Sequence, residues 1–131
     1  MSRRIITFGT FDVFHIGHIN ILERARKEGD YLIVGVSSDA LNFSKKNRYP
    51  VYSEEHRMKI LSSLKFVDEV FVEESLEKKP DYIQKFHADV LVMGDDWEGK
   101  FDQMKEYCEV KYLPRTPSIS TTEIIEVVKA L

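Results

Sequence analysis

Residues 9–18 read GTFDVFHIGH, and they decide how the rest of the chain is interpreted. They follow the apolar run Ile5–Phe8, which is typical of a short buried strand. They precede residues 19–27, where apolar side chains recur at helical spacing. The stretch is therefore predicted to be a strand-to-helix turn. Such turns in parallel α/β sheets lie at the carboxyl edge of the sheet, where open sheets bind ligands.

The residue types in this turn suit an anion. Gly9 and Gly17 carry no Cβ, so backbone and ligand can approach closely. The first amides of the following helix are unsatisfied and, with the helix dipole, favour negative charge. His15 and His18 are three residues apart, which lets both imidazoles face the same side of the turn. Two hydrogen-bond donors at such a place suit a phosphate whose charge grows during a reaction.

A metal site is the main alternative for the histidine pair. A His-x-x-His spacing by itself is more often incidental, or half of a zinc site. The chain has four histidines and one cysteine, which supply a closed zinc site poorly. The strand before the pair and the helix after it therefore favour the phosphate interpretation.

Downstream, apolar and polar segments alternate along the chain. The pattern predicts one domain over residues 1–131, with a Rossmann-like, doubly wound, five-stranded parallel sheet and helices on both faces. The connection Ser37–Tyr52 is interpreted as a long polar loop, a kind that often forms a lid. The expected strands are 5–8, 31–36, 67–72, 90–93 and 110–113, and the expected helices are 18–27, 53–64, 80–86 and 120–131.

Basic side chains follow the second expected strand. Lys45, Lys46 and Arg48 lie in the long connection, and Arg57 lies in the helix after it. A run of this kind is usually a solvated face, and an exposed helical arginine usually has no specific task. Because the net charge is −3, however, the cations needed for a phosphate ligand must be concentrated locally. These four side chains are therefore candidates for phosphate contact.

Two further strand ends carry polar residues. Gly94 permits a tight exit from the fourth strand, and Asp95 and Asp96 after it are suited either to a divalent metal or substrate hydroxyls, or to ordinary turn chemistry. After the fifth strand, Arg115 offers a bidentate phosphate donor. Ser120 begins the last helix, whose free amides form a second anion cradle that is compatible with plain helix capping.

Composition sets the remaining bounds. Hydrophobic residues make up 43% of the 131 residues and charged residues 31%, which is ordinary for a soluble domain. No apolar run is long enough to span a membrane, and we expect no targeting segment. The single Cys108 suits a reducing, cytoplasmic setting. A net charge of −3 without a basic tail argues against nucleic acid as a partner.

Several blocks of the sequence resemble one family. Residues 15–18 read HIGH, the signature of a nucleotidyltransferase superfamily that includes class I aminoacyl-tRNA synthetases, and GTFD upstream resembles its cytidylyltransferase branch. The chain further resembles the bacterial glycerol-3-phosphate cytidylyltransferases nearly end to end. The ISTT block at 119–122 is shared by many cytidylyltransferases, whereas MGDDWEG at 93–99 is the narrower pointer to the glycerol-phosphate enzymes.

The resemblance implies a reaction: cytidylyl transfer from CTP, with Mg²⁺, to sn-glycerol 3-phosphate. The products would be CDP-glycerol, for teichoic-acid-type polymers, and pyrophosphate. It also implies a homodimer and three sets of site residues. The catalytic set is His15, His18, Lys45 and Arg115. The nucleotide-binding set is Gly9, Thr10, Phe11, His15, His18, Gly94, Asp95, Arg115, Ile119, Ser120 and Thr121. The acceptor-binding set is Asp12, Lys45, Lys46, Arg57 and Trp97, with Asp12 also a candidate metal ligand.

The sequence leaves three alternatives open. The acceptor can be another phospho-alcohol such as phosphoethanolamine, because the chain departs from the family's pattern in the loop 44–52, at Ser118 and at Lys65. The enzyme can be an adenylyltransferase of the FAD-synthase type. The domain can also bind nucleotide without catalysis, although the intact histidine pair argues against that interpretation.

Overall fold

The computed structural model describes residues 2–115 and 120–131 and has a five-stranded, fully parallel sheet at its centre. The strand order is β3-β2-β1-β4-β5. The direction of winding reverses between β1 and β4, which is where open α/β sheets bind ligands. The strands are β1 (Arg4–Gly9), β2 (Tyr31–Ser37), β3 (Glu69–Glu73), β4 (Val90–Gly94) and β5 (Glu109–Leu113).

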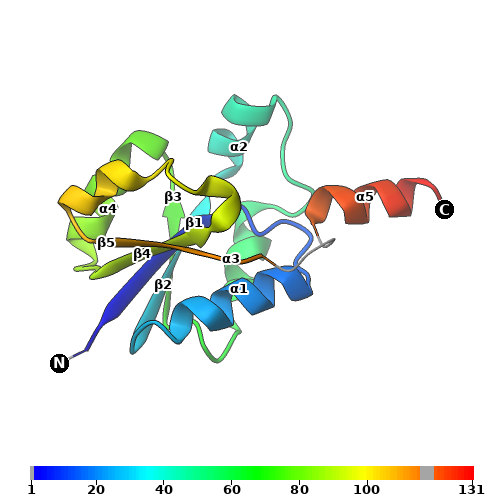
Figure 1. The fold of residues 1–131 in the computed structure, drawn as a ribbon. Helices are drawn as coiled ribbons and strands as arrows, with labels where there is room; N and C mark the ends of the chain where they lie inside the picture. Colours follow the sequence, from blue (N-terminus) through cyan, green and yellow to red (C-terminus); the bar gives the residue numbers. More distant parts are fainter. Residues whose placement is uncertain (1, 116–119) are drawn as a thin grey trace.

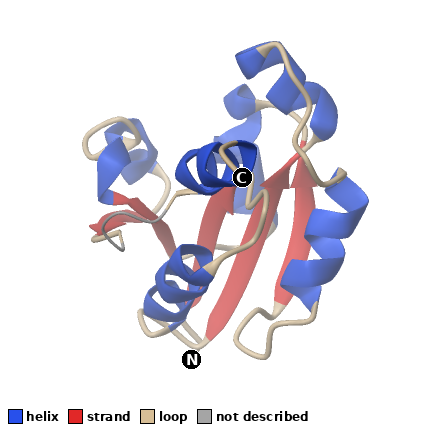
Figure 2. Cartoon of the chain, turned by 90° about the vertical axis from the view of Figure 1, so that its right-hand side faces the viewer, coloured by secondary structure: helices blue, strands red, loops and turns tan. Residues whose placement is uncertain are grey.

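Helices lie on both sides of this sheet (Figures 1 and 2). They are α1 (Ile16–Arg26), α2 (Asp39–Lys46), α3 (Glu54–Ser62), α4 (Lys79–Lys85) and α5 (Thr121–Lys129), with 3₁₀ turns at Leu76–Lys78, Asp95–Trp97 and Asp102–Glu106. The last helix reaches away from the sheet (Figure 1). None of the helices within residues 2–115 and 120–131 has the length and apolar character needed to cross a bilayer.

The core consists of two apolar clusters, one on each face of the sheet. Alternate residues of a strand point to opposite faces, so Ile5 packs in one cluster and Ile6 in the other. The first cluster includes Leu22 of α1 and Leu61 of α3, and the second includes Ile83 of α4. A sheet covered on both faces needs apolar side chains in both directions. This confirms the doubly wound sheet that the continuous apolar runs predict.

The largest difference from the sequence prediction is α2. The segment expected to be a polar loop contains a helix of eight residues. Ser38 caps it by accepting from the amide of Leu41 at 3.0 Å, and Asn47 ends it in the left-handed region with φ 56°. At eight residues the helix is too short to show a repeated apolar pattern, and its one buried side chain, Asn42, is polar. The other elements match within about two residues, although α1 begins at Ile16 rather than His18.

Candidate active site

The turn between β1 and α1 is built by its two histidines. The amide of Gly17 donates to Nδ1 of His15 at 3.0 Å, and the amide of His15 donates to Nδ1 of His18 at 3.2 Å. Each imidazole thus satisfies an amide that the helix start leaves without a partner. Because both Nδ1 atoms accept, the proton of each neutral ring lies on Nε2. The rings stack with their centroids 3.8 Å apart.

Both histidines are held in the neutral form. Burial lowers the pKa of His18 to about 3, with smaller contributions from His15 and Arg115. Burial, and then the charge of Arg115, also lowers the pKa of His15. Nε2 of His15 is buried and has no hydrogen-bond partner in the described part of the chain. A buried donor without an acceptor is costly in a folded protein, so this atom marks a place built for an incoming acceptor.

The backbone of this turn adopts an unusual conformation. Phe11 and Val13 have φ angles of 55° and 47°, in the left-handed region that disfavours side chains, and most of all β-branched ones. The ring of Phe11 then lies against His18, with centroids 5.4 Å apart. A Cβ on Gly9 would come within 2.8 Å of the Phe11 ring, so the glycine allows this arrangement. Strain of this kind concentrates at functional sites.

A cavity of about 1000 Å³ opens at the carboxyl ends of the strands, beside the histidines. This is the upper end of the usual range for small-molecule sites, and it has room for a nucleotide together with a second substrate. The structure brings thirteen of the residues predicted from the sequence to its wall: Gly9, Thr10, Phe11, Asp12, His15, His18, Lys45, Lys46, Gly94, Trp97, Arg115, Ser120 and Thr121.

Cations line the same cavity although the chain is acidic overall. Lys45 and Lys46 come from α2, Arg48 from the loop after it, and Arg115 from the end of β5. Burial lowers the pKa of Lys45, and the carboxylate of Glu73 opposes that shift. The positive charge that a polyphosphate needs is thus gathered at one edge of the sheet, as the sequence predicts.

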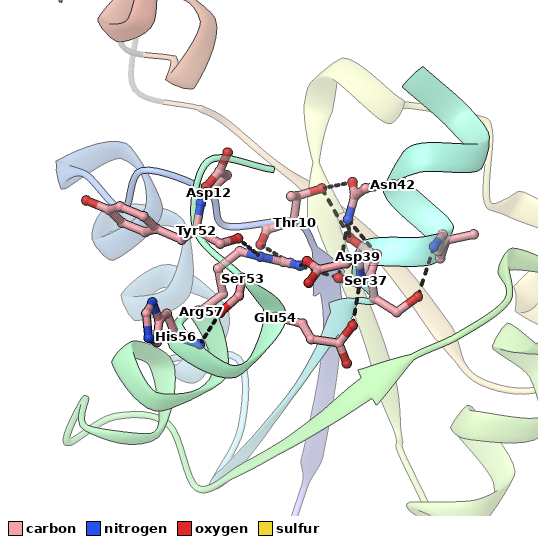
Figure 3. Close-up of polar contacts among 12 residues, drawn as sticks. Thr10, Asp12, Ser37, Asp39, Asn42, Tyr52, Ser53, Glu54, His56 and Arg57 are labelled. Atoms are coloured by element: carbon pink, nitrogen blue, oxygen red, sulfur yellow. Dashed lines mark hydrogen bonds and ion pairs between the residues drawn. The ribbon is translucent and has the colours of Figure 1, made fainter. Parts of the chain in front are cut away.

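Arg57 does not lie where a phosphate contact would need it. Its side chain is fully buried. The guanidinium donates to the carbonyls of Tyr52, Thr10 and Ser37 at 2.8–3.0 Å and pairs with Asp39 at 2.7 Å (Figure 3). It joins the ends of β1 and β2 to α2 instead of facing the cavity. The structure therefore does not support the predicted acceptor contact, which took Arg57 to be an exposed helical side chain.

Asp12 is committed to the backbone. Its carboxylate accepts from the amides of Val13, Val51 and Tyr52 at 2.7–3.0 Å, and its carbonyl accepts from the hydroxyl of Thr121 at 2.8 Å. These bonds hold the loop before α3 and the start of α5 against the β1–α1 turn. They leave one carboxylate lone pair, so Asp12 fits the predicted metal-ligand or acceptor role poorly.

Two other predicted residues lie outside the cavity wall or outside the described residues. Asp95 is exposed and does not line the cavity, whereas its neighbour Asp96 does, 3.5 Å from the guanidinium of Arg115. A Cβ on Gly94 would lie 2.6 Å from the carboxylate of Asp96, so a larger residue there would displace that side chain. Ile119 falls in 116–119, outside the described residues.

The sequence prediction missed three buried polar residues of the cavity wall. Lys79 and Glu73 form a buried ion pair, and the ammonium lies 4.7 Å from the centre of the Phe8 ring. Asn42 is 1% exposed and bonds to Thr10 and Ser37. No spacing signal marks these residues, since each acquires its partner only through the fold. Ser37, at the end of β2, is the one feature that could have directed attention to them.

The fit for a protein-bound metal is weak. Within the described residues no group of three or more His, Cys, Asp or Glu side chains could hold a metal ion. With the carboxylate of Asp12 engaged by three amides, the wall of the cavity does not form an oxygen cage of the kind that hard cations need.

Comparison with known proteins agrees with this geometry. A family model described as cytidylyltransferase-like matches residues 6–127. Glycerol-3-phosphate cytidylyltransferase from Bacillus subtilis is 51% identical, over 98% of this chain and 99% of that protein. The protein of the same name from Staphylococcus aureus is 50% identical, over 93% and 92%.

The fold itself recurs in a solved structure. The lipopolysaccharide core biosynthesis protein from Thermoplasma volcanium superposes with a TM-score of 0.76 at 23% identity, over 88% of this chain and 99% of that one. The histidine turn lies at the switch point of this shared sheet, and the family match covers nearly the whole chain. The chain therefore belongs to the cytidylyltransferase-like family of nucleotidyltransferases.

Proposed function

We propose that this protein transfers the cytidylyl group of CTP to sn-glycerol 3-phosphate and releases pyrophosphate. The observation that carries the proposal is the stacked histidine pair at the start of α1, with the buried Nε2 of His15 lacking an acceptor. The choice of substrates rests on the relatives that share about half of their residues with this chain over nearly its whole length.

The reaction makes one P–O bond and breaks another. An oxygen of the acceptor phosphate attacks the α-phosphorus of CTP, the bond from that phosphorus to the α,β-bridging oxygen breaks, and pyrophosphate leaves. The attacking phosphate is already ionised near neutral pH, so the step needs no general base from the protein. Catalysis then consists of alignment and stabilisation of charge on the phosphate oxygens.

The two imidazoles supply the central donors. With Nδ1 of each ring accepting from the backbone, His15 and His18 present Nε2–H groups to the α- and β-phosphates. The free amides and dipole at the start of α1 add to the field at the same point. Hydrogen-bond donors that are already oriented thereby stabilise the negative charge that develops on the phosphate oxygens during bond cleavage.

The basic side chains of the cavity contact two different substrates. Lys45 and Lys46 of α2 face the acceptor phosphate, and Arg115 neutralises the triphosphate together with the start of α5 at Ser120 and Thr121. What supports this assignment is that all of these residues line one cavity with the histidines. Trp97, whose ring is tilted against that of Phe101 with centroids 5.6 Å apart in the same wall, forms part of the acceptor end.

Magnesium enters this proposal with the nucleotide. The ion binds phosphate oxygens readily and usually needs only one or two protein carboxylates. We therefore propose that Mg²⁺ is held by the triphosphate of CTP and neutralises part of its charge when bound.

We also propose that the protein acts as a homodimer in the cytoplasm. The family resemblance implies a dimer. Ile16 and Val51 near the histidine turn are 54% and 64% exposed, as apolar side chains at an interface between copies would be in an isolated chain. Sedimentation equilibrium tests the oligomeric state. The single Cys108 is consistent with a reducing compartment.

Pyrophosphate release tests the activity. The assay contains Mg²⁺ and CTP, with ATP as the control nucleotide, and a panel of phospho-alcohols that includes sn-glycerol 3-phosphate and phosphoethanolamine. Turnover with CTP and glycerol 3-phosphate alone supports the proposal. Turnover with another acceptor keeps the reaction class and changes the substrate, and CTP binding without pyrophosphate release in any mixture would overturn the proposal.

A further inference from the structure

Helix α2 brings cations to the cavity, yet hardly any apolar packing holds it. Asn42 is the only fully buried side chain of the helix. The exposed ring of Phe43 contacts Tyr49 in the loop that follows, not the core. Polar contacts therefore decide how α2 is rotated about its axis, and hydrogen bonds fix such a rotation because they are directional.

Asn42 makes these contacts to both neighbouring strand ends. Its Nδ2 donates to the carbonyl of Ser37 at 3.2 Å, to the carbonyl of Ser38 at 2.9 Å and to the hydroxyl of Ser37 at 2.9 Å. Its Oδ1 accepts from the hydroxyl of Thr10 at 2.9 Å (Figure 3). Two of the three acceptors are carbonyls, so the nitrogen must be on this side and the amide orientation is fixed by its partners.

The orientation of the amide has a consequence for Thr10. Its hydroxyl has one hydrogen, which goes to Asn42, while its oxygen lies 3.1 Å from the hydroxyl of Ser37. Asn42, Ser37 and Thr10 thus close a ring of hydrogen bonds in which each side chain contacts the other two. The side chain of Thr10 is used to hold α2, and only its backbone remains for a phosphate.

Lys45 lies three residues after Asn42 and therefore on the same side of the helix. Asn42 and Lys45 both line the cavity. We propose that Asn42 is a positioning residue, which ties α2 to the β1–α1 turn through Thr10 and so sets where the ammonium of Lys45 meets the acceptor phosphate. The inference rests on the role of Lys45 in the proposed function.

A double-mutant cycle tests the coupling. We expect Asn42→Ala to raise the KM for glycerol 3-phosphate roughly tenfold, as lost hydrogen bonds displace Lys45, and to change the KM for CTP by less than about twofold. In a Lys45→Ala background the same change should add less than about twofold, because the residue that Asn42 positions is gone. Ser44→Ala is the matched control on α2, since within the described residues its exposed hydroxyl bonds only to the carbonyl of Leu41, and it should leave both constants unchanged.

The outcomes separate the two claims. If Lys45→Ala has no effect on the KM for glycerol 3-phosphate, the proposed role of Lys45 fails. If Lys45→Ala has an effect but Asn42→Ala acts additively with it, the positioning role alone is overturned. Equal changes in both KM values, together with a lower melting temperature, would mean a purely structural residue. Asn42→Ser replaces Asn42→Ala in the cycle if the alanine variant does not fold.

Hydrogen exchange gives a readout that needs no turnover. The amides of 42–46 should exchange at least about tenfold faster in Asn42→Ala than in the unaltered protein, with Ser44→Ala as the control. Unchanged protection of α2 in Asn42→Ala would overturn the proposal even if the protein proved inactive with every acceptor.

Discussion

His15 and His18 cap the helix that they help to begin, and this fixes their chemistry. Nδ1 of each ring accepts a hydrogen bond from a backbone amide, so Nε2 carries the proton and can donate. Burial lowers the pKa of both rings, and only the neutral ring can accept at Nδ1 while it donates from Nε2. The same contacts orient the rings before substrate arrives, so little reorganisation is needed during the reaction.

Replacing either histidine by alanine tests this role. We expect His15→Ala or His18→Ala to lower kcat by roughly two to four decades, the usual cost of removing a donor that stabilises charge in a transition state. The measurement is pyrophosphate release at saturating substrates, with circular dichroism to check the fold. A loss under threefold in both variants would remove the pair from the chemistry.

The buried His18 should also make stability depend on pH. Its pKa is about 3 in the folded protein and about 6.5 when unfolded. Above pH 6.5 the ring is neutral in both states. Between pH 6.5 and 3 only the unfolded chain binds the proton, so the free energy of unfolding falls as pH falls, by up to about 1.4 kcal/mol per pH unit.

His18→Asn isolates this effect, since its amide oxygen can still accept from the amide of His15. We expect the free energy of unfolding of the unaltered protein, measured in urea, to fall more steeply than that of the variant between pH 6.5 and 4. The carboxylates titrate alike in the two proteins, so the difference between their curves reports on residue 18. Parallel curves for the two proteins over this range would contradict a depressed pKa of His18.

Helix α3 supports the site through the buried side chain of Arg57. The guanidinium fastens the end of β1, the end of β2 and the start of α2 at one point (Figure 3). A lysine would offer one centre for these partners, whereas the planar fork reaches several at once. The arrangement makes α3 the support on which α2 and the β1–α1 turn are both set.

We therefore expect Arg57→Met to destabilise the protein. It leaves Asp39 without its ion-pair partner and removes a donor from three carbonyls, of which that of Ser37 keeps Asn42. Because the Asp39 side chain is 30% exposed, we expect the free energy of unfolding to fall by about 3 kcal/mol, the lower end for breaking a buried pair. Urea denaturation measures this directly. A variant of full stability whose KM for glycerol 3-phosphate is raised would instead restore a direct contact between Arg57 and the acceptor.

Charge is distributed unevenly over the molecule as a whole. The chain carries −3 overall, yet Lys45, Lys46, Arg48 and Arg115 line one cavity. Asp12, Glu73 and Asp96 also lie in the wall, but the cations outnumber them. A concave site with an excess of positive charge attracts anions from a distance, and dissolved ions weaken that attraction. Substrate capture should thus depend on ionic strength more than the chemical step does.

Salt provides the test at this level. We expect the KM for glycerol 3-phosphate to rise about two- to fivefold between 0.05 and 0.5 M NaCl, as screening shortens the reach of the cavity's charges. The value of kcat should change little, because the bound substrates are partly shielded from solvent. A KM that is independent of salt would mean that these cations do not steer the acceptor.

The sequence was sufficient to predict those features of the fold that depend on residues close together in the chain. Runs such as Tyr31–Val36 predict strands because a parallel sheet buried on both faces needs apolar side chains in both directions. The HIGH turn predicts its own position between a strand and a helix. Helix α2 escaped prediction since polar side chains occupy most of its positions and its one buried residue, Asn42, is polar too.

The sequence by itself thus determined the strands, the α-helices other than α2, the histidine turn and the family, because periodicity and short motifs are local properties. Only the tertiary structure decided what each polar side chain does. Arg57 and Asp12 look like ligands for phosphate or metal until the fold surrounds them with carbonyls and amides, and Lys79 acquires Glu73 only when α4 packs beside β3. Burial and partners arise from chain segments far apart in sequence, which is why no reading along the chain could assign them.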